Sequence, residues 1–128
     1  MAKLKLCAAL LGSFAGIMWG EMDGLLTALI IFVIIDYITG VIDGIYTKTL
    51  SSEIGYKGIF KKVCIFIMVA VAHIIDLYVI KEGAAVRSSV IFFYLANEGI
   101  SILENITVLD VPVPAKLAEI LKNLDKNS

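Results

Sequence analysis

Apolar residues fall into four long blocks along the chain, separated by short polar breaks. The blocks cover residues 6–20, 25–46, 59–80 and 88–108, and the breaks carry charged residues and glycine. A helix needs about 20 apolar residues to cross a bilayer. The second and third blocks contain 22 residues each, or about 33 Å of helix. The pattern predicts an all-α fold: a single membrane domain that forms a multi-pass transmembrane helical bundle of three to four membrane helices.

The first block, residues 6–20, is short for a span. It crosses the membrane if Lys5 extends its ammonium group to the interface and the bilayer thins locally. Alternatively, it is re-entrant or lies at the interface. Its basic start also resembles a secretory signal. Gly12 and Gly16 form a GxxxG pattern, which allows two helices to approach closely.

The C-terminal region changes character after the fourth block. Pro112 and Pro114 end the apolar region, because proline cannot continue a helix. Residues 114–125 then have the three-and-four spacing of an amphipathic helix. Its apolar face consists of Leu117, Ile120, Leu121 and Leu124. We expect this short helix to be cytoplasmic and to rest on the membrane surface or on partner subunits.

Composition supports a membrane protein and argues against several other classes. The chain is 59% hydrophobic and 18% charged, with a mean hydropathy of +0.92, whereas soluble domains are about 45–50% apolar and about 25% charged. No basic stripe with interleaved aromatics is present, so we expect no nucleic-acid partner. The chain has one histidine, no nucleophile motif, no phosphate-binding loop and no cluster with metal-ligand spacing. We therefore expect no enzyme activity, no cofactor and no metal.

The distribution of basic residues predicts the orientation. With four spans and a cytoplasmic N-terminus, nine lysines lie inside, and only Lys81 and Arg87 lie outside. The inner lysines are Lys3, Lys5, Lys48, Lys57, Lys61, Lys62, Lys116, Lys122 and Lys126. If the first block does not cross, the split becomes seven against four. The positive-inside rule therefore favours four spans with both termini inside.

Polar residues inside the blocks share helix faces, and we call them together the polar seam. On helical spacing, one face of each block gathers several of them. The seam comprises Asp36, Thr39, Gly40, Asp43 and Gly44 of the second block, His73 and Asp76 of the third, and Asn97, Glu98, Ser101, Glu104 and Asn105 of the fourth.

The energetics of the seam restrict what it faces. A carboxylate at mid-bilayer costs at least about 2.5–3.5 kcal/mol, so the seam must face protein or water. Two interpretations stay open. The seam either holds helices together, or it lines a hydrated lumen or subunit contact in an oligomer.

Counting turns from each helix midpoint sorts the charged residues by depth. Asp36, Asn97 and Glu98 fall near the middle, where no cation is expected. Lys57, Lys61 and Lys62 form a cytoplasmic charge layer near Asp43 and Glu104, and Arg87 is the outer charge near His73 and Asp76. We therefore expect Lys62 to pair with Asp43 or Glu104, and Arg87 to pair with Asp76.

Four motifs in one order resemble the toxin-secretion/phage-lysis holin family of Gram-positive phages and clostridia. They are Asp36-Tyr37-Ile38-Thr39-Gly40; Ser51-Ser52-Glu53 with Gly55-x-Lys57-Gly58 and Lys61-Lys62; Asn97-Glu98-Gly99-x-Ser101-Ile102-x-Glu104-Asn105; and Val111-Pro112-x-Pro114. The resemblance covers roughly residues 25–124.

This resemblance implies a protein that controls cell lysis. A holin accumulates in the bacterial cytoplasmic membrane, forms homo-oligomers and opens lesions that release an endolysin or a large protein toxin. The partners it implies are the lipid bilayer, further copies of the chain and, functionally, that released protein. Initiation at Met18 or Met22 would remove the first block.

Two other functions are compatible with the residues. A small ion channel or proton-linked transport subunit would use His73, Asp76, Asp36 and Glu98 as a relay. Such a transporter would normally show repeats or broken helices, and neither is evident. A purely structural membrane partner would neither conduct ions nor kill the cell.

Overall fold

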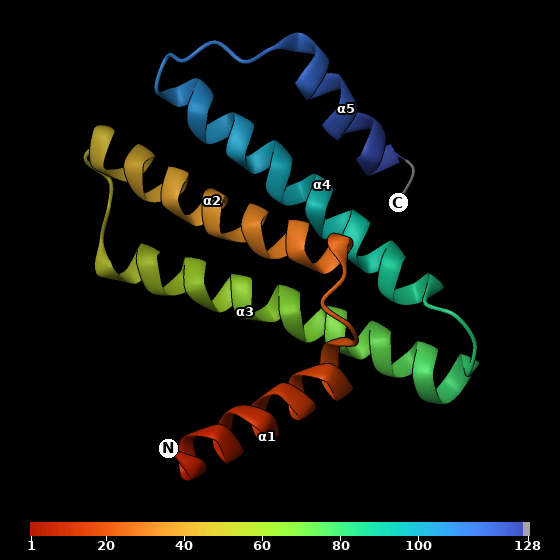
Figure 1. The fold of residues 1–128 in the computed structure, drawn as a ribbon. Helices are drawn as coiled ribbons and strands as arrows, with labels where there is room; N and C mark the ends of the chain where they lie inside the picture. Colours follow the sequence, from red (N-terminus) through yellow and green to blue (C-terminus); the bar gives the residue numbers. More distant parts are fainter. Residues whose placement is uncertain (127–128) are drawn as a thin grey trace.

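The computed structural model describes residues 1–126, and the regular structure in that range is helical (Figure 1). The helices are α1 (Ala2–Trp19), α2 (Gly24–Tyr46), α3 (Ser52–Ile74), the π-helix η1 (Ile75–Ile80), α4 (Ala85–Val108) and α5 (Ala115–Lys126). The predicted all-α class is confirmed. Three helical segments are long and apolar enough to cross a membrane: α1, α2 and the continuous segment Ser52–Ile80. α4 is not among them, although it runs beside α2 and has a similar length.

Side-chain caps set the starts of α2 and α3. The Asp23 carboxylate accepts a hydrogen bond from the Leu26 backbone N–H at 2.9 Å, and the Ser51 hydroxyl accepts one from the Ile54 N–H at 3.2 Å. Asp and Ser are favoured at this position because each satisfies a backbone donor that has no partner within the helix. The cap at Ser51 makes α3 begin at Ser52 rather than at residue 59. Lys62 is therefore ten residues, or about 15 Å, into the helix.

α2, α3 and α4 form the bundle. α4 packs along α2, and α3 packs against both (Figure 1). Their apolar stripes bury Leu29, Val69 and Ile91 completely. The outward side of α2 is a row of exposed isoleucines at helical spacing, which suits lipid contact. These are Ile31, Ile34, Ile35, Ile38, Ile42 and Ile45.

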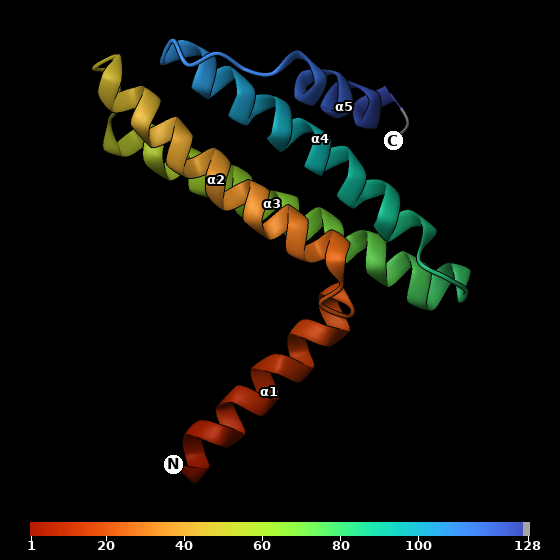
Figure 2. The same ribbon diagram turned by 45° about the horizontal axis from the view of Figure 1, so that its top comes forward.

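α1 projects away from the bundle, as the turned view in Figure 2 shows. It has no buried residue. Its C-terminal end is fixed, because the Trp19 indole N–H donates a hydrogen bond to the Phe66 carbonyl of α3 at 2.7 Å. The chain then turns at Gly20, whose φ of 80° and ψ of −164° are accessible essentially only to glycine.

α5 folds back along α4 of the same chain, and both views show the two helices side by side (Figures 1 and 2). Of its predicted apolar face, Leu121 is buried against α4 and Leu124 is half-buried, whereas Leu117 and Ile120 are exposed. The amphipathic helix predicted for residues 114–125 is therefore packed against its own bundle. This position differs from the predicted one on the bilayer surface or on partner subunits.

Candidate functional site

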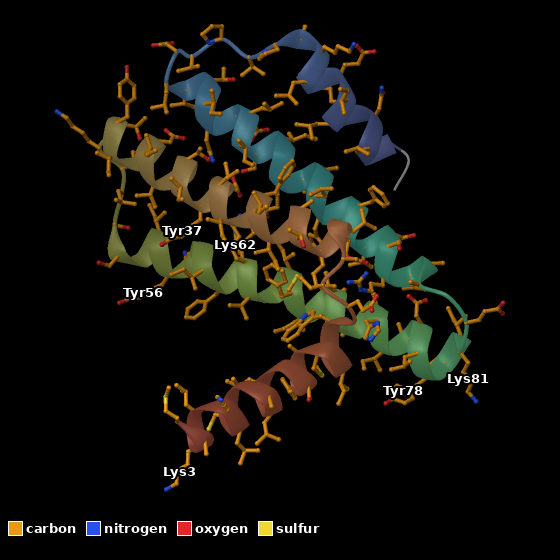
Figure 3. The ribbon with its side chains drawn as sticks, viewed as in Figure 1. Lys3, Tyr37, Tyr56, Lys62, Tyr78 and Lys81 are labelled. Carbon is orange, nitrogen blue, oxygen red and sulfur yellow. The ribbon has the colours of Figure 1, made fainter. Side chains whose placement is uncertain are left out.

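Three helices contribute to a charged centre inside the bundle. The Lys62 ammonium group of α3 contacts the Asp36 carboxylate of α2 and lies 2.7 Å from Glu98 Oε2 of α4. Figure 3 shows Lys62 reaching into the space between α3 and α2. Asp36 and Glu98 are buried, and the Lys62 side chain is 19% exposed. We call Asp36, Lys62 and Glu98 the central triad; with both carboxylates ionised, it carries one net negative charge.

Polar side chains one turn away complete the surroundings of Asp36. The Asn105 amide nitrogen donates hydrogen bonds to Asp36 Oδ1 and to the Thr39 hydroxyl, both at 3.0 Å. Thr39 also donates to the Ile35 carbonyl of its own helix. Gly40 lies beside the Asn105 amide, and a Cβ added there would make an ordinary van der Waals contact with it at 3.7 Å. These contacts join α2 to α4.

The buried polar atoms are satisfied within one copy of the chain. Across the described residues, every buried side-chain nitrogen or oxygen has a hydrogen-bond partner. A buried polar atom without a partner would be costly in a membrane. The central triad therefore does not by itself require a second copy.

Lys62 does not form the pairs expected from the sequence. Its partners are Asp36 and Glu98 rather than Asp43 or Glu104. The middle layer therefore contains a cation, contrary to our expectation. The reason is the early start of α3, which moves Lys62 about 15 Å from the helix end.

A second charged cluster lies where the α1–α2 connection meets the start of α4. Arg87 is buried and donates to the Trp19 carbonyl at 2.7 Å, the Glu21 carbonyl at 3.0 Å and Asp23 Oδ2 at 2.7 Å. A second, longer bond of 3.4 Å joins it to Asp23 Oδ1. We call this the outer clamp. The hydrogen bond from Arg87, assisted by the Leu26 N–H, lowers the pKa of the Asp23 carboxyl below its usual value.

Asp76 does not form the predicted ion pair with the Arg87 side chain. Its carboxylate accepts hydrogen bonds from the backbone N–H groups of Val86 at 3.1 Å and Arg87 at 2.8 Å. It therefore caps the N-terminus of α4 from the neighbouring segment η1, where a negative charge is favoured. The Arg87 guanidinium pairs with Asp23 instead. His73 lies beside this cluster and, with Asp76 and Arg87, lines a cavity of about 310 Å³.

The remaining residues of the predicted seam and charge layer do not join the triad. Gly44 packs on Leu50, Lys57 pairs with Glu53 at 3.5 Å on the surface, and Asp43 is half-buried at the end of α2. Lys61, Asn97 and Glu104 are exposed. Ser101 and Asn97 line a groove of about 470 Å³ beside Lys61 and the triad.

Sequence reasoning missed Asp23 as a site residue. The available signal was its position, because an acidic residue directly before a long apolar run is typical of a helix cap. Its second role, as the partner of Arg87, joins residues that are 64 positions apart. No local pattern indicates that pairing.

Comparisons with known proteins identify the family. A family model described as the bacteriophage holin family matches residues 13–126. An uncharacterised protein of Listeria monocytogenes is 48% identical over 113 residues, covering 88% of this chain and 77% of its own. An uncharacterised protein of Clostridium perfringens is 38% identical over 125 residues, covering 98% of this chain and 93% of its own.

One similar protein has a functional name. A probable holin of Bacillus phage phi105 is 34% identical over 111 residues, covering 87% of this chain and 81% of its own. No solved structure matches the chain. The family model covers most of the chain, including the three helices that build the central triad. The chain therefore belongs to the bacteriophage holin family.

Proposed function

We propose that the protein forms homo-oligomers in a bacterial cytoplasmic membrane and opens lesions that release an endolysin or a large protein toxin. Family membership is the observation that carries this proposal. The structure is compatible with it, because α1, α2 and α3 present long apolar surfaces to their surroundings. A chain of 128 residues with this much exposed apolar surface suits accumulation within a bilayer.

The charge distribution supports an orientation in which the end of the bundle that joins α2 to α3 is cytoplasmic. Lys48 and Lys57 lie at or near the end of the bundle where α2 is joined to α3. Lys81 lies at the opposite end (Figure 3). Basic residues are retained preferentially on the cytoplasmic side. The α2–α3 connection would then be cytoplasmic, and the outer clamp would lie toward the outside.

Inducible expression in a bacterium tests the proposal. The protein would be produced alone and together with an endolysin that lacks any export signal. We expect sudden loss of viability in both cultures and collapse of turbidity only in the culture with endolysin. An ion channel would depolarise cells without releasing the endolysin, and a structural partner would leave them viable. Either result would contradict the proposal.

A further inference from the structure

The position of α5 creates a physical conflict with a lipid environment. Leu121 of α5 packs on Gly99 of α4, where an added Cβ would lie only 2.7 Å from Leu121 Cδ2. α4 runs from Ala85 to Val108, so Gly99 is close to its midpoint. A docked α5 therefore reaches about the middle of the bilayer whenever α4 spans it.

The outer side of α5 is charged along this length. Lys116, Glu119 and Lys122 are exposed, and Lys122 directly follows the buried Leu121. The apolar Leu117 and Ile120 are exposed beside them. A charged side chain near the bilayer centre costs at least about 2.5–3.5 kcal/mol. Contact with lipid is therefore unfavourable for this side of the docked helix, and contact with water is favourable.

α4 extends the same polar character over the part of its surface that α5 leaves uncovered. Ser89, Asn97 and Glu104 are exposed at positions that recur at intervals of eight and seven residues on one face of the helix. Phe93 is an exposed apolar residue between Ser89 and Asn97 on this face. Asn97 lies at mid-helix. The outward side of α2, by contrast, carries exposed isoleucines such as Ile34 and Ile38. The bundle therefore has an apolar side on α2 and a side on α4 and α5 where polar and charged groups are mixed with apolar ones.

The central triad is not the surface that we expect water to contact. Its carboxylates are buried and are bonded to Lys62 and Asn105 inside the bundle. The exposed polar groups along the length of α4 are those of the α4–α5 face, and Lys61 of α3 is exposed beside the groove that Asn97 lines. We define this face by six residues: Ser89, Asn97, Glu104, Lys116, Glu119 and Lys122.

We propose that the α4–α5 face is the surface that lines the water-filled lesion, with α5 remaining docked on α4. The inference rests on the proposed function and assigns the side of the protein that water contacts. Docked α5 covers apolar surface of α4 and replaces it with a polar wall. The wall carries charges of both signs, so it favours neither cations nor anions. Such a lining suits passage of folded proteins better than selective conduction of ions.

Thiol labelling tests which residues face water. In a Cys7→Ser, Cys64→Ser background, single Asn97→Cys and Ile38→Cys proteins would be expressed without endolysin. A membrane-impermeant cationic methanethiosulfonate would be added outside the cells before and after the loss of viability. We expect the Asn97→Cys protein to be labelled only after that point. The Ile38→Cys protein, whose changed position is on the exposed side of α2, should stay unlabelled throughout. Absence of labelling at position 97 after lesion opening would overturn the inference, as would equal labelling at both positions.

A reversible crosslink tests whether α5 stays docked. Gly99→Cys and Leu121→Cys would be combined in the same background, because those two positions are in contact. We expect the oxidised protein to kill cells and to release endolysin as well as the reduced protein does. Loss of killing on oxidation, with recovery on reduction, would show that α5 must leave α4 and would overturn the inference.

The two proposals fail in distinguishable ways. If the background protein never breaches the membrane, the proposed function fails and the inference fails with it. If the membrane is breached but position 97 stays unlabelled, or the crosslink blocks killing, only the inference fails.

Discussion

Lys62 connects two carboxylates that come from two other helices, Asp36 and Glu98. Removing one member of a buried charged group leaves the others without compensation, which is strongly destabilising. Lys61 provides a matched control, because it is the adjacent lysine and is exposed. The two lysines therefore separate the effect of the triad from that of positive charge alone.

We predict that Lys62→Met lowers the free energy of unfolding by about 3 kcal/mol because it leaves Asp36 and Glu98 unpaired. Lys61→Met should change it by less than about 1 kcal/mol. Adding Asp36→Asn and Glu98→Gln to Lys62→Met should recover much of the loss. Unfolding by SDS in mixed micelles, followed by circular dichroism, measures the free energy of unfolding of these three variant proteins. Equal effects of the two lysine substitutions would contradict the role given to Lys62.

The outer clamp predicts a dependence on acidic pH. The pKa of Asp23 is lower in the folded protein than its usual value of 3.8. Its ion pair therefore stabilises the folded state above about pH 4, and this contribution is lost as the pH falls through the folded pKa. The clamp holds the Trp19 carbonyl, and Trp19 is the single tryptophan of the chain.

We predict that Trp19 fluorescence in micelles is constant from pH 7 to about pH 4.5 and changes below pH 3.8 as the clamp opens. The Asp23→Asn protein should show the altered spectrum already at pH 7, with no further transition in that range. A transition of the same size in both proteins would mean that Asp23 is not the titrating group.

At the level of single helices, the sequence predicted which segments are helical better than it predicted the contacts between them. Hydrophobic periodicity indicated the four long helices and the amphipathic C-terminal helix, because burial and lipid contact both follow local spacing. It did not indicate that α3 begins at Ser52, which depends on the Ser51 cap within a polar stretch. The earlier start of α3 places Lys62 in the middle of the bundle rather than at its cytoplasmic end. Counting helical turns from the predicted midpoints therefore could not predict the triad.

The contact between α5 and α4 depends on glycine at position 99. Gly99→Ala should displace α5, because the added Cβ would lie 2.7 Å from a Leu121 methyl carbon. We predict faster tryptic cleavage in α5, at Lys116 and Lys122, for this protein in detergent. Adding Leu121→Ala should slow the cleavage again by making room. Gly12→Ala is the matched control, since nothing lies within 4 Å of a Cβ there. Unchanged cleavage in the Gly99→Ala protein would contradict the observed packing.

For the whole molecule, the sequence indicated a helical membrane protein and a specific family, and both were confirmed. It did not indicate that, within residues 1–126, one copy satisfies its own buried polar groups, because that depends on residues brought together from distant helices. The polar seam thus separates into an internal part, which holds α2, α3 and α4 together, and an exposed part that includes Asn97 and Glu104. The oligomer that we propose would then form through surfaces outside the triad.

The central claim is that assembled copies open a lesion large enough for folded proteins. The most direct measurement uses purified protein reconstituted at high density into vesicles loaded with a small dye and a fluorescent protein of endolysin size. The account predicts that both leave the vesicles together, and that the Lys61→Met protein behaves in the same way. Release of the dye with complete retention of the fluorescent protein would contradict it.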